Sequence, residues 1–152
     1  MTISFLPETK PTLNDAYVSV EMFNEQTHLK NQGAIAMIHS QFIKGYITSE
    51  ALMLAASYYN RFLEIVKNNV YPEGGYHSPN EVFSENINTM ICLCMIGLAN
   101  KMLEDEPLLY YHEILKYNSF GYFNRYHTDL IPCLEDFNRL EREIVEALEF
   151  RL

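Results

Sequence analysis

The sequence predicts an all-α globular domain of five helices, preceded by an additional N-terminal helix. Nearly every patterned segment repeats its apolar residues at helical spacing rather than in strict alternation. One central segment is apolar almost all round, which is typical of a helix that is surrounded by others. The final segment, residues 134–152, combines one apolar stripe with a charged back, as expected for a helix that covers a core.

Length and net charge limit the classes of protein to which this chain can belong. At 152 residues the chain is long enough for one domain with a substantial core, and hydrophobic residues make up 48% of it. The net charge of −9, with Lys and Arg scattered singly, argues against nucleic-acid binding. We therefore expect one folded domain whose partner is not a nucleic acid.

The compartment is predicted from cysteine usage and from the absence of targeting patterns. Three cysteines do not form a disulfide framework in a chain of this size. The N-terminus lacks a basic region followed by an apolar run, and the longest strongly apolar run, Met90 to Ala99, is too short to span a bilayer. We expect a soluble intracellular protein, in the cytoplasm, the nucleus or both, that has no membrane partner.

The first two helices follow a predicted flexible arm. Residues 1–13 contain two prolines and no apolar stripe, which leaves 14–152 as the single domain. The first helix is expected from Asn14 or Asp15 to about Leu29, with one face formed by Val18, Met22 and Phe23. After Gly33 a second helix runs from residue 34 to 43, where Lys44-Gly45 is typical of a helix C-terminus.

The third helix begins at a cap, Thr48 or Ser49, and ends at Asn68-Asn69. Its expected buried stripe consists of Leu52, Leu54, Ala55, Tyr58, Tyr59, Phe62, Leu63 and Val66. Residues 71–79 contain two Gly and two Pro, so they are expected to form a loop.

The central helix is expected from Ser84 to about Glu104, with Ser78 as a second candidate cap upstream. Pro107 suits the first turn of a shorter helix over residues 108–117. An aromatic connector, 119–131, leads to the terminal helix. Its aromatic residues are expected either to cover the junction between helices or to form a partner-binding surface.

Glu141 lies close to the apolar stripe of the terminal helix. The stripe consists of Phe137, Leu140, Ile144 and Leu148, and is widened by Leu134 and Val145. One interpretation is a solvated glutamate at the edge of an amphipathic helix. The other requires a lysine elsewhere in the chain, because an unpaired buried charge is costly.

Lys101 is the first charge after the long apolar run of the central helix, and it lies 40 residues before Glu141. A simple interpretation is a lysine at a helix C-terminus, where the helix dipole favours a cation by about 0.3–1 kcal/mol. Of the charged residues in the chain, however, Lys101 and Glu141 are the two that lie closest to the apolar stripes of their predicted helices.

These segments together resemble the cyclin box. The residues that carry the resemblance are Tyr58-Tyr59-Asn60-Arg61-Phe62-Leu63, Ala99-Asn100-Lys101 followed by acidic residues 104–106, Leu140-Glu141-Arg142, and Phe150-Arg151-Leu152. The segment Phe137-Asn138-Arg139-Leu140-Glu141 is most similar to the single-box phosphate-pathway (P-type) cyclins. The resemblance covers about residues 30–152 and implies a five-helix cyclin box with a central apolar helix.

The resemblance implies a regulatory subunit of a cyclin-dependent protein kinase. By analogy with the family, Lys101 and Glu141 would reach main-chain groups of the kinase. Apolar contacts would come from Met102, Val145, Phe150 and Leu152. Such a protein is not an enzyme and needs no cofactor or small-molecule substrate. It selects the active arrangement of the kinase by binding that arrangement more tightly.

Two departures from the family pattern leave an alternative open. Asn60 stands where the family usually has aspartate, and the first helix offers no clear arginine to pair with it. The substrate-docking motif of cell-cycle cyclins has no counterpart. The alternative is a cyclin-fold adaptor or scaffold that binds a protein other than a kinase.

Enzymatic interpretations find little support in the sequence. The five histidines are dispersed without metal-ligand spacing, and no phosphate-binding glycine loop or nucleophile elbow occurs. Cys92 and Cys94 point about 200° apart on a helix and cannot share a metal. Cys133 near His127 is a formal nucleophile pair, although a buried structural thiol is favoured. Ser78-Pro79 is a minimal proline-directed phosphorylation site.

Overall fold

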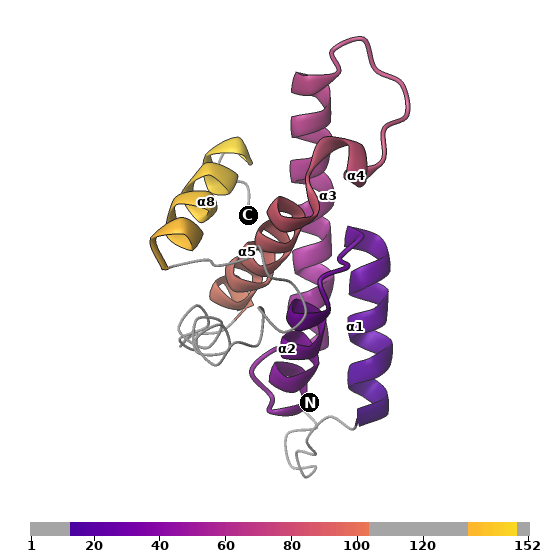
Figure 1. The fold of residues 1–152 in the computed structure, drawn as a ribbon. Helices are drawn as coiled ribbons and strands as arrows, with labels where there is room; N and C mark the ends of the chain where they lie inside the picture. The colour runs from indigo at the N-terminus through magenta and orange to yellow at the C-terminus, as the bar shows by residue number, and fades with distance from the viewer. Residues whose placement is uncertain (1–12, 104–133, 149–152) are drawn as a thin grey trace, which may run out of the picture.

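The computed structural model describes residues 13–103 and 134–148. All regular secondary structure in these two ranges is helical, which confirms the predicted all-α class there. The helices are α1 (Leu13–Thr27), α2 (Gln32–Ile43), α3 (Ser49–Val70), α4 (Pro79–Val82), α5 (Glu85–Leu103) and α8 (Leu134–Ala147) (Figure 1). The arm up to residue 12, the predicted helix 108–117 with its connector, Cys133, His127, Phe150 and Leu152 lie outside the described residues.

The helices begin where short polar side chains accept hydrogen bonds from the first turn. Asn31 Oδ1 accepts from the Ala34 amide at 2.9 Å at the start of α2, and Thr48 Oγ1 accepts from the Ala51 amide at 3.1 Å at the start of α3. Gly45, which follows α2, has φ of +84°, a conformation that favours glycine. The predicted limits of α2 and α3 are therefore confirmed to within two residues.

The two serines that compete as caps each precede a different helix. Ser78 precedes the short α4, whose first residue is Pro79. Ser84 Oγ accepts from the Ile87 amide at 3.3 Å at the start of α5. The separate helix α4 was not predicted, because its four residues are too few to show a periodic pattern.

The core is built around α5. Every residue from Ile91 to Asn100 is buried, and α5 packs most extensively on α3, with α8 on another side (Figure 1). Of the described helices, α5 is the one long and apolar enough to cross a membrane, but 67% of that stretch is buried inside the protein. A core helix passes the same test of length and composition, so this is weak evidence for a membrane span.

The predicted face of α1 is partly wrong. Phe23 is buried as expected, but Val18 and Met22 are exposed. The buried face is formed instead by Val20, Phe23 and Thr27, which lie three and four residues apart and pack toward α2 and α3. Apolar residues occupy both sides of this helix, and the sequence does not show which side meets the core.

A buried polar network connects three parts of the fold. The Tyr59 hydroxyl donates to Asn88 Oδ1 at 2.5 Å. Asn88 Nδ2 donates to the carbonyl oxygens of Thr27 at 3.0 Å and His28 at 3.3 Å. Burial, with Cys92 nearby, strongly raises the pKa of Tyr59, which keeps its hydroxyl protonated as a donor. The neighbouring Asn60, which stands where the cyclin family usually has aspartate, is exposed.

Candidate partner-binding site

The C-terminal end of α5 leaves the core abruptly at Lys101. Ten consecutive buried residues end at Asn100, and the next three, Lys101 to Leu103, are exposed. Lys101 lies in the last turn, where the helix dipole favours a cation.

Helix α8 presents Glu141 to this end of α5. Phe137 and Ile144 are fully buried and Leu148 nearly so, which confirms the predicted stripe. Cys94 Sγ on α5 donates to the Phe137 carbonyl at 3.8 Å, a weak contact that links the two helices. Glu141 lies four residues after Phe137 and three before Ile144, so it shares the buried face of α8 with them.

Lys101 and Glu141 form an ion pair, with 2.6 Å between Nζ and Oε1, across 40 residues of sequence. The Lys101 side chain is 46% exposed and that of Glu141 only 17% exposed. Glu141 is therefore not a fully solvated glutamate. Of the two interpretations of Glu141, the one that requires a lysine from elsewhere in the chain is correct.

Apolar side chains accompany the ion pair. Met102 is 50% exposed, and the adjacent Leu103 is also exposed. Val145 and Leu140 on α8 are half-buried and pack against the core. Leu103 was not among the predicted contacts, although its position beside Met102 at the end of an apolar run was a usable signal. The predicted contacts Phe150 and Leu152 are not tested, since both lie beyond residue 148.

This combination of groups is suited to binding. A charge-assisted hydrogen bond holds a lysine ammonium in place next to exposed apolar surface, an arrangement that can meet main-chain oxygens and apolar side chains of another protein. In residues 13–103 and 134–148, no three His, Cys, Asp or Glu side chains lie together in a way that could hold a metal ion.

The buried thiols of α5 are not suited to nucleophilic chemistry. Cys92 and Cys94 are both fully buried. Burial raises the pKa of Cys92 to about 12, despite a hydrogen bond with Thr27 that acts in the opposite direction. Cys92 therefore stays a neutral thiol at physiological pH.

The loop between α3 and α4 is organised by a histidine. The His77 ring stacks on Tyr71 with centroids 3.5 Å apart, and its Nδ1 lies 3.0 Å from Glu81 Oε2. The hydrogen bond from His77 lowers the pKa of Glu81, with smaller contributions from Ser78. These contacts tie the loop locally to α4.

Comparison with known proteins identifies no relative. The sequence matches no protein-family model, and no curated protein or solved structure is significantly similar to the chain.

Proposed function

We propose that the protein is a non-catalytic regulatory subunit that binds and activates a cyclin-dependent protein kinase through a cyclin-box domain. The observation that carries the proposal is the ion pair between Lys101 and Glu141. The cyclin-box resemblance selects these two residues from all the charges in the chain, and they lie together at a surface where α5 and α8 meet.

The surroundings of the pair support a role in binding. A lysine ammonium has three donors, and the exposed Lys101 side chain can donate to a main-chain oxygen of the kinase while Glu141 orients it. Met102 follows Lys101 in sequence and is half exposed, and Val145 lies one turn after Glu141 and is partly buried, so both can supply apolar contact area. The enclosed α5 keeps this surface rigid, because its position is determined by packing on all sides.

Activation then follows from differential binding. A kinase with inactive and active arrangements shifts toward whichever arrangement the partner binds more tightly. The regulatory subunit needs no nucleophile, metal or cofactor for this effect. A lysine–glutamate ion pair within the kinase is the arrangement that must be assembled.

The test is affinity capture of the tagged protein from cells of its own source, followed by identification of the bound proteins. We compare wild type, Lys101→Glu, and the double reversal Lys101→Glu/Glu141→Lys. The matched control is Lys67→Glu, which makes the same charge change at another lysine that forms an ion pair, here with Glu64 on the surface of α3. Circular dichroism establishes that each variant is folded.

A cyclin-dependent kinase captured by wild type and by Lys67→Glu, but depleted at least about tenfold with Lys101→Glu, is the expected result. The double reversal restores an ion pair within the protein but not the donors that meet the kinase, so we expect it to stay defective. Equal capture by Lys101→Glu, or full recovery by the double reversal, would contradict the proposed role of the pair.

One observation favours the alternative function, a cyclin-fold adaptor or scaffold for a non-kinase protein. Asn60 is exposed, so no buried ion pair like that of the cyclin family is formed at this position. The same capture experiment separates the two functions. An adaptor would retain some other protein and no kinase.

A further inference from the structure

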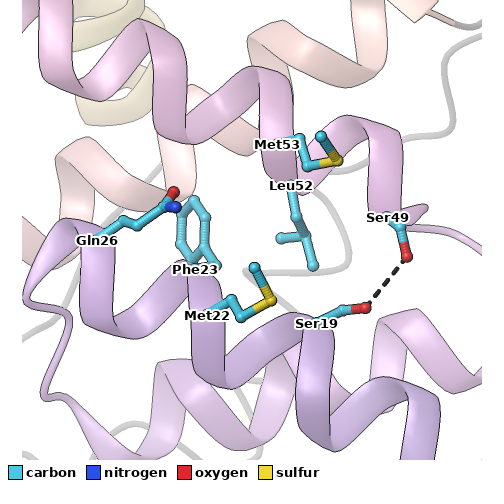
Figure 2. Close-up of a pocket in the computed structure, with 7 residues that line it drawn as sticks. All are labelled: Ser19, Met22, Phe23, Gln26, Ser49, Leu52 and Met53. Atoms are coloured by element: carbon cyan, nitrogen blue, oxygen red, sulfur yellow. Dashed lines mark hydrogen bonds between the residues drawn. The ribbon is translucent and has the colours of Figure 1, made fainter.

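A second surface lies between α1 and α3. A pocket of about 100 Å³ lies there. Figure 2 shows the residues of both helices that line it. Its buried residues are Phe23 and Leu52, and the Ser19 and Ser49 hydroxyl groups hydrogen-bond at 3.1 Å across one end. We call this feature the α1–α3 groove.

Two methionines flank the groove and are largely exposed. Met22 on α1 is 54% exposed and Met53 on α3 is 72% exposed. Val18, one turn before Met22, is exposed as well. Methionine is flexible and polarisable, and it is common at surfaces that adapt to apolar side chains of a partner. Clustered exposed apolar residues around a pocket are typical of an interaction site.

The charges beside the groove are of one sign. Glu25 and Glu50 are next in sequence to the lining residues Gln26 and Ser49, and both are exposed, whereas Glu21 interacts electrostatically with His39 of α2. Neither α1 nor α3 before Arg61 contains a lysine or an arginine. An apolar pocket with an acidic border is complementary to a partner that carries an apolar side chain between basic ones.

We propose that the α1–α3 groove binds a basic amphipathic helix of a protein partner, with one aliphatic side chain inserted between Met22 and Met53. A pocket of about 100 Å³ has room for one such side chain. Lysine or arginine residues beside this anchor would face Glu25 and Glu50, the mode of recognition in which a helix lies in a groove.

This site is distinct from the Lys101–Glu141 surface. In Figure 1, α8 and α1 lie on opposite sides of the paired helices α3 and α5. The inference goes beyond the proposed function and does not depend on it. A partner in the groove would leave the Lys101–Glu141 surface accessible, so the protein could hold two partners at once.

The test measures fluorescence anisotropy of two labelled helix-forming peptides with the full 152-residue chain. Both peptides have the same leucine positions, and their polar positions are all lysine in one and all glutamate in the other. The protein variants are Met22→Gln/Met53→Gln, which removes apolar contact without a charge change, and Glu25→Gln/Glu50→Gln, which removes charge. Ile87→Gln, at an exposed apolar residue outside the groove, is the control.

We expect the lysine peptide to bind wild type and Ile87→Gln equally, and the methionine double variant about tenfold more weakly. The glutamate double variant should bind about threefold more weakly and show a smaller salt dependence. Three results would overturn the proposal: no binding of the lysine peptide, equal binding of the glutamate peptide, or no effect of the methionine changes. Sedimentation that shows self-association lost in the methionine variant would instead assign the groove to a second copy of the chain, which also overturns it.

Discussion

Helices α5 and α8 both contribute to the core, but they are held in different ways. From Ile91 to Asn100 α5 is buried on every side, whereas α8 buries one stripe and exposes Arg139, Arg142 and Glu143. The position of a helix that is enclosed by others is fixed by packing contacts on all its sides. A helix held along one stripe keeps an open face that can meet a partner.

An ion pair between Lys101 of α5 and Glu141 of α8 connects the two helices. At Lys101 the enclosed helix becomes exposed, and at Glu141 the one-sided helix carries a partly buried carboxylate on its buried face. We infer that substitutions in the enclosed part of α5, Ile91 to Asn100, change stability strongly, while those at Lys101 and Glu141, where the proposed partner binds, change stability only slightly. Three measurements test this contrast.

The largest effect is expected within α5. Leu93 is fully buried, and Leu93→Ala removes its contacts and leaves a cavity, so we expect a loss of about 2–5 kcal/mol in the free energy of unfolding. Urea denaturation followed by circular dichroism measures the change. Ile87→Ala, an exposed position on the same helix, is the control and should change stability by no more than about 0.5 kcal/mol. Similar losses for the two variants would show that α5 is not enclosed as described.

A smaller effect is expected at the polar network near the start of α5. Tyr59→Phe removes the donor to Asn88 Oδ1 and leaves that buried oxygen unpaired, which should reduce stability by about 1–3 kcal/mol. The same denaturation experiment measures it, with Tyr46→Phe at an exposed tyrosine as the control. If Tyr59→Phe and its control behave alike, the network contributes nothing to stability beyond its apolar contacts.

Sequence patterns predicted the parts of the fold whose signal is local. The helix α3 was predicted with its cap and its stripe, because Thr48 and the spacing of residues 52–66 suffice for both. The enclosed α5 was predicted from composition, since a helix without a polar face must be surrounded. The buried face of α1 could not be predicted in this way. Apolar residues lie on two sides of α1, Val20 and Phe23 on the buried side and Val18 and Met22 on the exposed side, and only packing with other helices decides which side is buried.

The same distinction holds for the candidate sites. The position of Glu141 beside Leu140 is a local feature, and it predicts a carboxylate that pairs with a lysine if it is buried; the structure pairs it with Lys101. The α1–α3 groove was not foreseen, because it depends on how two helices lie against each other. No pattern within α1 indicates that Met22 will line one pocket together with Met53.

The smallest effect is expected at the Lys101–Glu141 pair, and its size bears directly on its role. We expect a double-mutant cycle with Lys101→Met and Glu141→Gln to give a coupling energy of about 0.2–1 kcal/mol, because nearly half of the lysine side chain is exposed to screening water. Added salt should reduce the coupling further. A coupling of about 3 kcal/mol or more would indicate a pair that holds the fold together. A coupling within the expected range would show that the variants keep the fold, so the cycle in the free protein should precede any binding experiment with them.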